Sequence, residues 1–215
     1  MARETYVVAG TDTGIGKTVF AAALTRALDG CYWKPVQSGV DDDGGTDTTR
    51  ARALSGLPDE RFLPEAYKLQ SPLSPHRAAE IDGVEIDHRE LALPSCERPL
   101  VVELAGGLLV PLRPDLLQID VVSMWGAPVI LCARTTLGTI NHTLLSLEAL
   151  RRRGIPLLGV AFIGGANPAT EAAILGFGQA RRLGRLPVLE ELTPTAIARA
   201  FAAGFSLRDF AEAVA

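Results

Sequence analysis

The chain has 215 residues, of which 47% are hydrophobic and 21% are charged, and its formal net charge at pH 7 is −4. This composition is typical of a globular protein, and no run of about 18 apolar residues predicts a membrane span. The acidic balance argues against a nucleic-acid partner, because a duplex-binding surface needs clustered Lys and Arg. The length fits one domain over residues 1–215.

The N-terminus and the cysteines indicate the compartment. The first ten residues carry one acidic and one basic side chain and lead straight into an apolar run, unlike a signal or transit peptide. The three cysteines, Cys31, Cys96 and Cys132, are odd in number, far apart and without metal-ligand spacing. We therefore expect a cytoplasmic protein with reduced thiols and no membrane contact.

Apolar runs flanked by turn residues predict buried strands. In chain order they cover residues 5–10, 31–33, 99–104, 127–133 and 156–163. The runs are too continuous for strands with one exposed face, so helices should cover both faces of the sheet.

Helical spacing occurs between these strands. Apolar residues recur every three or four positions from Phe20 to Leu28 and from Ile140 to Leu147. A further helix is predicted over residues 47–55, within a segment from 38 to 98 that is rich in Asp, Gly, Pro and Ser and supplies loops over the site. The alternation predicts an α/β fold with a mostly parallel sheet flanked by helices on both faces.

The segment GTDTGIGKT at residues 10–18 joins the first predicted strand to the first helix. This arrangement turns backbone N–H groups and the helix dipole toward an anion, which predicts a phosphate-binding loop of the P-loop NTPase type. In that pattern Lys17 contacts the β- and γ-phosphates and the Thr18 hydroxyl binds Mg²⁺. Five residues separate Gly10 from Gly16, one more than usual. The alternative is a tight strand-to-helix turn with an exposed lysine.

The site should lie at one edge of the sheet, because ligands of open α/β sheets bind beyond the carboxyl ends of the strands. The loops that meet there follow Gly10, Pro35, Glu103, Ala133 and Ile163. Glu103 ends a strongly apolar strand, where a carboxylate is costly to bury without a cation.

Four further motifs accompany the loop. They are KPVQSG at residues 34–39, PLSPH at 72–76, ELAGG at 103–107 and LGTINH at 137–142. In this order, over about residues 5–187, they resemble the dethiobiotin synthetase family, in which the longer phosphate loop is also found. Related P-loop ATPases that partition cargo or deliver metals carry a second lysine early in the loop, and none stands between Gly10 and Gly16.

The resemblance implies an ATP- and Mg²⁺-dependent cyclo-ligase of biotin synthesis. Its substrates are 7,8-diaminononanoate, carbon dioxide and ATP, and its products are dethiobiotin, ADP and phosphate. A carbamate of the diamine takes up the γ-phosphate as a carbamic-phosphoric anhydride, and the neighbouring amine closes the ring. Such chemistry needs mainly positioning and charge neutralisation. The alternative function is a nucleotide-switched partitioning or metal-delivery ATPase of the same superfamily.

Three residues are expected to be catalytic by this resemblance. Lys34 matches the family's lysine that meets the carbamate and the γ-phosphate, although a lysine at a sheet edge is usually solvated. Lys17 acts on the transferred phosphate, and Thr13 wraps the phosphates and touches the carbamate. Ser38 hydrogen-bonds the diamine or its carbamate.

Magnesium prefers oxygen ligands, and the resemblance assigns Thr18, Asp47 and Glu103. Asp47 opens the segment DTTRARALSG, which matches the family's helix start. The acids at 41–43 lie in a Gly-rich loop, where a run of acids is usually solvated. Asp43 is the alternative to Asp47.

The nucleotide is expected to contact the loop, the sheet edge and the segment after the last predicted strand. The expected contacts are Gly14, Ile15, Gly16, Lys17, Thr18, Val19, Asp47, Glu103, Gly106, Ile163, Gly164, Leu186, Pro187 and Val188. Many family members place an Asn where Ile163 stands, and its carboxamide reads both polar edges of adenine. An apolar side chain lacks that donor and acceptor, so we expect relaxed base selection that admits CTP or GTP alongside ATP, unless Asn167 compensates.

The segment LGTINH opens a helix after residues 127–133, and Gly138 permits close approach to its free N–H groups. In the family this region binds the substrate's carboxylate across a homodimer interface. The expected substrate contacts there are Leu137, Gly138, Thr139 and Asn141. Without the resemblance, N-capping by Thr139 or Asn141 is the simpler interpretation.

Overall fold

The protein is built around a seven-stranded sheet. The computed structural model describes residues 4–211, and the paired strands of this sheet are all parallel, in the order β11-β10-β9-β1-β6-β2-β4. The bounds are β1 Thr5–Gly10, β2 Cys31–Trp33, β4 Phe62–Leu63, β6 Leu100–Gly107, β9 Val129–Arg134, β10 Leu157–Ile163 and β11 Arg182–Leu186.

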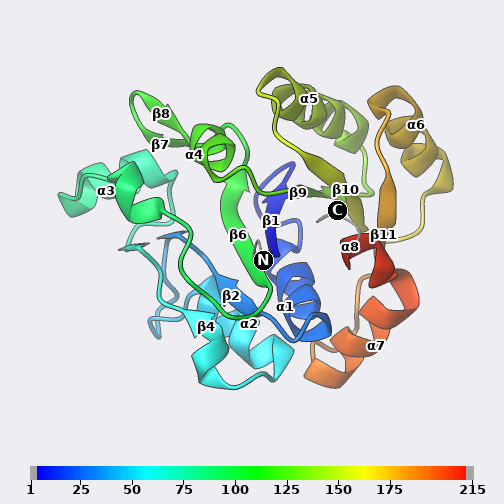
Figure 1. Cartoon of the computed structure of the whole chain (residues 1–215), viewed down its shortest axis with the longest axis horizontal. Coiled ribbons are helices and arrows are strands. Elements are labelled where there is room, and N and C mark those ends of the chain that lie inside the picture. The colour runs from blue at the N-terminus through cyan, green and yellow to red at the C-terminus, as the bar shows by residue number, and fades with distance from the viewer. Residues whose placement is uncertain (1–3, 212–215) are drawn as a thin grey trace.

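Helices cover both faces of this sheet, as Figure 1 shows. The first face carries α1 (Lys17–Ala27), α2 (Asp47–Ser55) and α7 (Pro194–Gly204), and the second carries α4 (Gln118–Trp125), α5 (Thr139–Arg152) and α6 (Pro168–Gly178). The predicted fold class, a mostly parallel sheet flanked by helices on both faces, is therefore confirmed.

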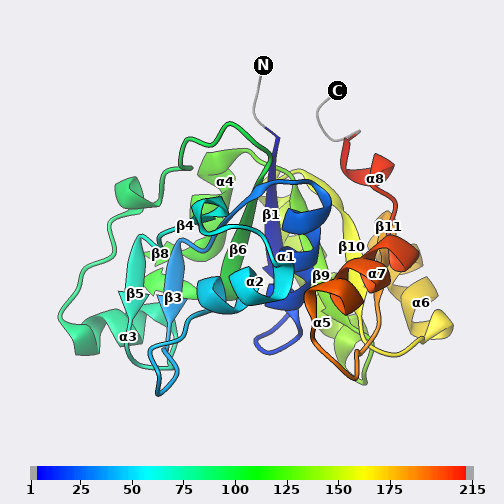
Figure 2. The same ribbon diagram turned by 90° about the horizontal axis from the view of Figure 1, so that it is seen from below.

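Smaller elements lie beside the sheet. Figure 2 shows α3, β3 and β5 together at one end of the molecule. Their bounds, with those of a hairpin, two 3₁₀ turns and a last short helix, are α3 Pro75–Asp82, β3 Val36–Ser38, β5 Tyr67–Leu69, β7 Pro111–Arg113, β8 Leu116–Leu117, Asp59–Arg61, His88–Leu91 and α8 Arg208–Ala211. β3 pairs with β5 in parallel, so the chain after β2 forms a separate two-stranded sheet.

The core lies on both sides of the sheet because side chains alternate along each strand. On β1, Tyr6 and Val8 pack with the residues of α1 and α7, whereas Val7 and Ala9 pack with those of α4, α5 and α6. All four are fully buried. Burial on both faces is the physical reason that this strand reads as a continuous apolar run.

The structure also corrects two expectations. Cys31 and Cys96 are joined by a disulfide, so the expectation of three reduced thiols is wrong for this pair, and Cys132 is a buried free thiol. The strand β11 was not predicted, because only Leu183 and Leu186 among its five side chains are apolar and buried. Over residues 4–211, the helices lack the length or the apolar character needed to cross a bilayer.

Tyr6 fastens the end of the described chain to the core. Its side chain is fully buried, and its hydroxyl donates to the Phe210 carbonyl at 2.6 Å. Burial, together with the Glu4 carboxylate, raises the pKa of Tyr6 from 10.0 to about 12. Between these two values the folded state keeps a proton that the unfolded state has lost, so this group's contribution to stability is lost as the pH rises.

We expect Tyr6→Phe to lower the free energy of unfolding by about 1 kcal/mol at pH 7, because a buried hydrogen bond is lost. Above pH 10 the variant should lose stability less steeply than the wild type, since phenylalanine does not ionise. Urea denaturation followed by circular dichroism between pH 7 and 11 measures both effects. Parallel curves for the two proteins across this range would contradict the assignment.

Candidate active site

The loop at residues 10–18 runs from the end of β1 to the first turn of α1. Gly16 precedes the helix with a φ of 94°, a left-handed conformation that favours glycine. A Cβ at Gly16 would lie 3.0 Å from Ile163 Cγ2, and a Cβ at Gly10 would lie 2.8 Å from Lys17 Cδ. These two glycines therefore let the loop lie on β10 and let the Lys17 side chain fold back over the end of β1.

Lys17 holds its ammonium inside this loop. Its Nζ donates to the Asp12 carbonyl at 2.8 Å, and the residue is 6% exposed. Burial lowers the pKa of Lys17 more than the Glu103 carboxylate raises it. A desolvated cation at the start of a helix is a favourable partner for an anion, because the helix dipole adds to the same field.

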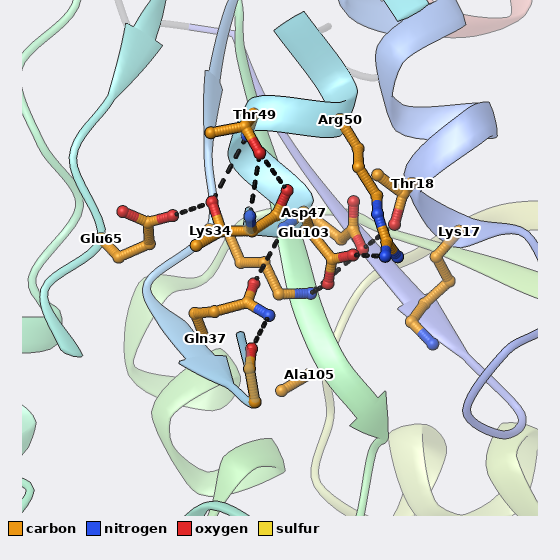
Figure 3. A network of polar contacts seen from close by, with 12 residues as sticks. Lys17, Thr18, Lys34, Gln37, Asp47, Thr49, Arg50, Glu65, Glu103 and Ala105 are labelled. Carbon is orange, nitrogen blue, oxygen red and sulfur yellow. Dashed lines mark hydrogen bonds and ion pairs between the residues drawn. The ribbon is translucent and has the colours of Figure 1, made fainter. Parts of the chain in front are cut away.

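Glu103 is the acidic centre of the site, near the middle of β6. Its side chain is 1% exposed, and both oxygens accept hydrogen bonds. Oε1 accepts from Thr18 Oγ1 at 2.9 Å and from Lys34 Nζ at 3.1 Å, and Oε2 accepts from the Tyr32 hydroxyl at 2.9 Å. The carboxylate is thus satisfied by three side chains, from the start of α1, from β2 and from the residue that follows β2, as Figure 3 shows for Thr18 and Lys34.

Lys34 joins Glu103 to helix α2. Its Nζ lies 2.7 Å from Asp47 Oδ2, and its side chain is 4% exposed. Burial acts to lower the pKa of Lys34, but the Glu103 and Asp47 carboxylates together raise it. Burial likewise acts to raise the pKa of Asp47, and Lys34 outweighs it and lowers that pKa. Lys34 and Asp47 are therefore both charged at neutral pH.

The donor set around Lys34 fits a magnesium ion. A hydroxyl and two carboxylates converge here from Thr18, Asp47 and Glu103, and Mg²⁺ takes a few protein oxygens and keeps waters. Asp43 instead accepts a hydrogen bond from the Gly45 N–H at 3.0 Å, within its own loop. The geometry thus brings Asp47 to the other two oxygen donors.

Two cavities meet at Lys34. The first has a volume of about 620 Å³. The predicted site residues that line it are Thr13, Gly14, Gly16, Lys17, Thr18, Val19, Lys34, Asp47, Glu103 and Gly106. The second, of about 520 Å³, shares Thr13, Lys34, Asp47 and Gly106 with it and extends past Ser38 to the start of α3. Both cavities are therefore lined by Lys34, so a ligand in either one lies close to this side chain.

Ser38 faces the second cavity with a free hydroxyl. Its Oγ is buried and has no hydrogen-bond partner among residues 4–211. An unsatisfied buried hydroxyl is unfavourable without a ligand or water to bond it. Ser38 is therefore placed to hydrogen-bond a polar substrate.

The predicted substrate contacts on α5 lie away from these two cavities. Gly138 is the residue before the helix, with a φ of 93° and no side-chain cap, so capping by Thr139 or Asn141 is not observed. Thr139 instead donates to the Arg134 carbonyl at 2.7 Å. Leu137 is fully exposed. Within one chain, this helix start does not face the Lys34 site.

The residues expected to hold the base are also outside the first cavity. Ile163 packs against Gly16 under the loop, and the Gly164 N–H donates to the Leu186 carbonyl at 2.9 Å. Val188 is 81% exposed. Asn167 caps α6 by accepting from the Thr170 N–H, and its amide donates to the Thr135 carbonyl, so both ends of its carboxamide are occupied.

Four residues that line the first cavity were not predicted from the sequence. They are Arg50, Ala53, Leu54 and Leu192. The first three lie on α2 at positions i, i+3 and i+4, the spacing of one helix face. That spacing was the available signal, since the helix over residues 47–55 was predicted. Leu192 lies in the loop before α7 and carries no such signal.

The chain resembles known proteins over nearly its full length. A family model described as an AAA domain matches residues 4–196. The ATP-dependent dethiobiotin synthetase BioD of Rhodopseudomonas palustris strain BisA53 is 63% identical over 204 residues, covering 95% of each chain. The chain belongs to the dethiobiotin synthetase family. The dethiobiotin synthetase BioD of Agrobacterium fabrum strain C58 is 58% identical over 207 residues, covering 96% of this chain and 97% of that relative.

Solved structures of other ATPases share the fold of this chain. The cell division ATPase MinD of Pyrococcus furiosus superposes with a TM-score of 0.57 at 16% identity, covering 100% of this chain and 98% of that chain. A ParA family ATPase from Chlorobium tepidum has a TM-score of 0.52 at 10% identity, covering 100% and 98%. At these identities the likeness concerns the fold alone, whereas the dethiobiotin synthetases match in sequence over nearly the full chain.

Proposed function

We propose that this protein is an ATP- and Mg²⁺-dependent cyclo-ligase that converts 7,8-diaminononanoate and carbon dioxide to dethiobiotin, ADP and phosphate. The observation that best supports this reaction is the position of Lys34. Its ammonium stands where a cavity behind the phosphate loop meets a second cavity, as a reaction between a nucleotide and another substrate requires. The family membership supports the same reaction. We also propose a single catalytic domain over residues 1–215.

The chemistry divides between the two cavities. In the second, one amine of the diamine adds to carbon dioxide and loses a proton, which gives a carbamate. A carbamate oxygen attacks the γ-phosphorus as the bond to ADP breaks, and the product is a carbamic-phosphoric anhydride. The neighbouring amine then attacks the carbamoyl carbon, loses a proton and expels phosphate, which closes the ring. Lys34 holds the carbamate and the transferred phosphate together and offsets their negative charge.

The other residues position the reactants. Lys17 and the N–H groups of Gly14, Ile15 and Gly16 bind the phosphates, and Thr13 borders both cavities. Ser38 bonds the diamine or its carbamate. Thr18, Asp47 and Glu103 would hold Mg²⁺, which would supply neutralisation of phosphate charge.

A nucleotide-switched partitioning or metal-delivery ATPase is the rival function. The phosphate loop has no lysine between Gly10 and Gly16. That absence, together with Lys34 at the junction of two cavities, favours the ligase.

Product analysis tests the proposal. The protein is incubated with the diamine, bicarbonate, Mg²⁺ and ATP, and dethiobiotin is sought by mass spectrometry. We expect dethiobiotin and phosphate in equal amounts. Release of phosphate without the ring product would favour the switch function, and omission of the diamine is the control.

We further propose relaxed base selection at the nucleotide site. The side chains of Val19, Ala53, Leu54 and Leu192 that line the first cavity are apolar and carry no donor or acceptor to read a base. Apolar contacts discriminate weakly between ligands that differ in their polar groups. We expect KM values for ATP, CTP and GTP within about tenfold of one another. A KM series over the four nucleotides measures this, and a preference for ATP above about a hundredfold would contradict it.

A homodimer is proposed to complete the diamine site. The start of α5 lies outside both cavities of one chain, and Leu137 and Ile140 there are exposed apolar side chains. Exposed apolar groups that cluster at one place mark protein interfaces. Light scattering after size-exclusion chromatography is expected to give twice the mass of 22.8 kDa.

The cytoplasmic location stays a prediction, and fractionation of cells that express the protein measures it.

A further inference from the structure

Arg50 is a charged residue of the first cavity to which the roles above give no part. It lies on α2 three residues after Asp47, so the two side chains share a helix face. Ala53 and Leu54 continue that face into the same cavity. Figure 3 shows the Arg50 side chain reaching toward Asp47, and Arg50 and Thr18 both line the first cavity. Helix α2 therefore presents a permanent positive charge to the space behind the phosphate loop.

The present partner of Arg50 is exchangeable. Its Nη2 lies 2.7 and 2.6 Å from the two oxygens of Asp41, and its Nη1 lies 4.0 Å from Asp47 Oδ1. The Arg50 and Asp41 side chains are 58% and 45% exposed, and such exposed ion pairs contribute little to stability. Lys34, in contrast, is buried between two carboxylates. Of these two cations, Arg50 is the one that a polyanion can recruit at small cost.

The chemistry of the guanidinium indicates which anion replaces Asp41. Its planar fork binds phosphate oxygens with the same geometry as a carboxylate, and a phosphate chain carries more charge than one carboxylate. We propose that Arg50 binds the phosphate chain of the nucleotide and leaves Asp41 when the nucleotide enters. Arg50 is then a catalytic residue, and Asp41 competes with the nucleotide for it. This inference rests on the proposed function, which places the nucleotide in the first cavity.

Two substitutions with opposite effects test this exchange. ATP affinity is measured by titration calorimetry with Mg²⁺ on the full chain. Arg50→Ala should weaken ATP binding by about tenfold, since a charge-assisted contact is lost. Asp41→Asn should strengthen it by about twofold to threefold, because a weak exposed competitor is removed. Arg50→Lys, which keeps the charge and loses the fork, should lie between Arg50→Ala and the wild type.

Arg52 supplies the matched control. It lies on the same helix and pairs with Asp59 at 3.2 Å, outside the first cavity. Arg52→Ala should leave ATP affinity within about twofold of the wild type, because exposed pairs of this kind are weak. Thermal unfolding of each variant shows whether α2 is intact. If Arg50→Ala does not fold, Asp41→Asn and Arg50→Lys still decide the question.

The outcomes separate this inference from the proposed reaction. If Arg50→Ala and Asp41→Asn weaken ATP binding equally, the pair only fastens α2 to its loop, and the inference is overturned. Unchanged ATP affinity in Arg50→Ala overturns it as well. A wild type that forms dethiobiotin while Arg50→Ala binds ATP normally refutes the inference alone. A wild type that binds ATP tightly but forms no dethiobiotin refutes the reaction alone.

Discussion

Lys34→Ala is expected to abolish dethiobiotin formation and to leave most of the nucleotide affinity. The ammonium lies at the junction of the two cavities, 3.1 Å from Glu103 Oε1 and 2.7 Å from Asp47 Oδ2. Its loss removes the positive charge shared by the carbamate and the transferred phosphate. Removal of one positioned donor of this kind costs about 10²–10³ in kcat, so we expect kcat to fall by about a thousandfold.

Two measurements define this result. Product is quantified by mass spectrometry, and ATP affinity is measured by calorimetry. The variant also leaves Glu103, which is 1% exposed, without its lysine, so its stability should fall by several kcal/mol. Assays are therefore run below its unfolding midpoint. Lys68→Ala is the control, because Lys68 is exposed and bonds only the Gly44 carbonyl among the residues 4–211. Retention of more than about a tenth of wild-type kcat would contradict a catalytic role.

The fold was largely predictable because its central strands are buried on both faces. Val7 and Ala9 face one set of helices and Tyr6 and Val8 the other, so the β1 segment is apolar throughout and easy to recognise. Edge elements lack this signal. β11 is an edge strand that contains Arg182 and Arg185, with Gly184 between them, and its pairing depends on β10 rather than on its own periodicity.

The site was predictable where a residue's chemistry conflicts with its surroundings. A glutamate in the apolar β6 run requires a cation, and the structure supplies Lys34 and the hydroxyl of Thr18. Arg50 was missed because an arginine on a polar helix looks like an ordinary solvated residue. The disulfide between Cys31 and Cys96 was missed because 65 residues separate them in sequence, and only the β2–β6 pairing brings these segments together.

Lys17→Ala is expected to abolish both dethiobiotin formation and most nucleotide binding. The side chain passes over the end of β1, and its buried ammonium bonds the Asp12 carbonyl at 2.8 Å, within the loop that receives the phosphates. Among the residues that the structure describes, no carboxylate lies within ion-pair distance of it. A phosphate would therefore be its first anionic partner, and hydrogen bonds to charged groups contribute ~1.5–3 kcal/mol. We expect ATP affinity to fall by about a hundredfold.

Lys17 and Lys34 differ in the groups that bond their ammoniums. Lys34 is already neutralised by two carboxylates, so its removal changes the charge that a nucleotide meets less than the removal of Lys17 does. Calorimetry with ATP on both variants should therefore show a large loss for Lys17→Ala and a small one for Lys34→Ala, although neither forms product. Lys17→Arg, which keeps the charge on a longer side chain, should recover part of the binding. Equal losses of ATP affinity in the two alanine variants would contradict this division of roles, because each lysine would then be a phosphate-binding residue of the same kind.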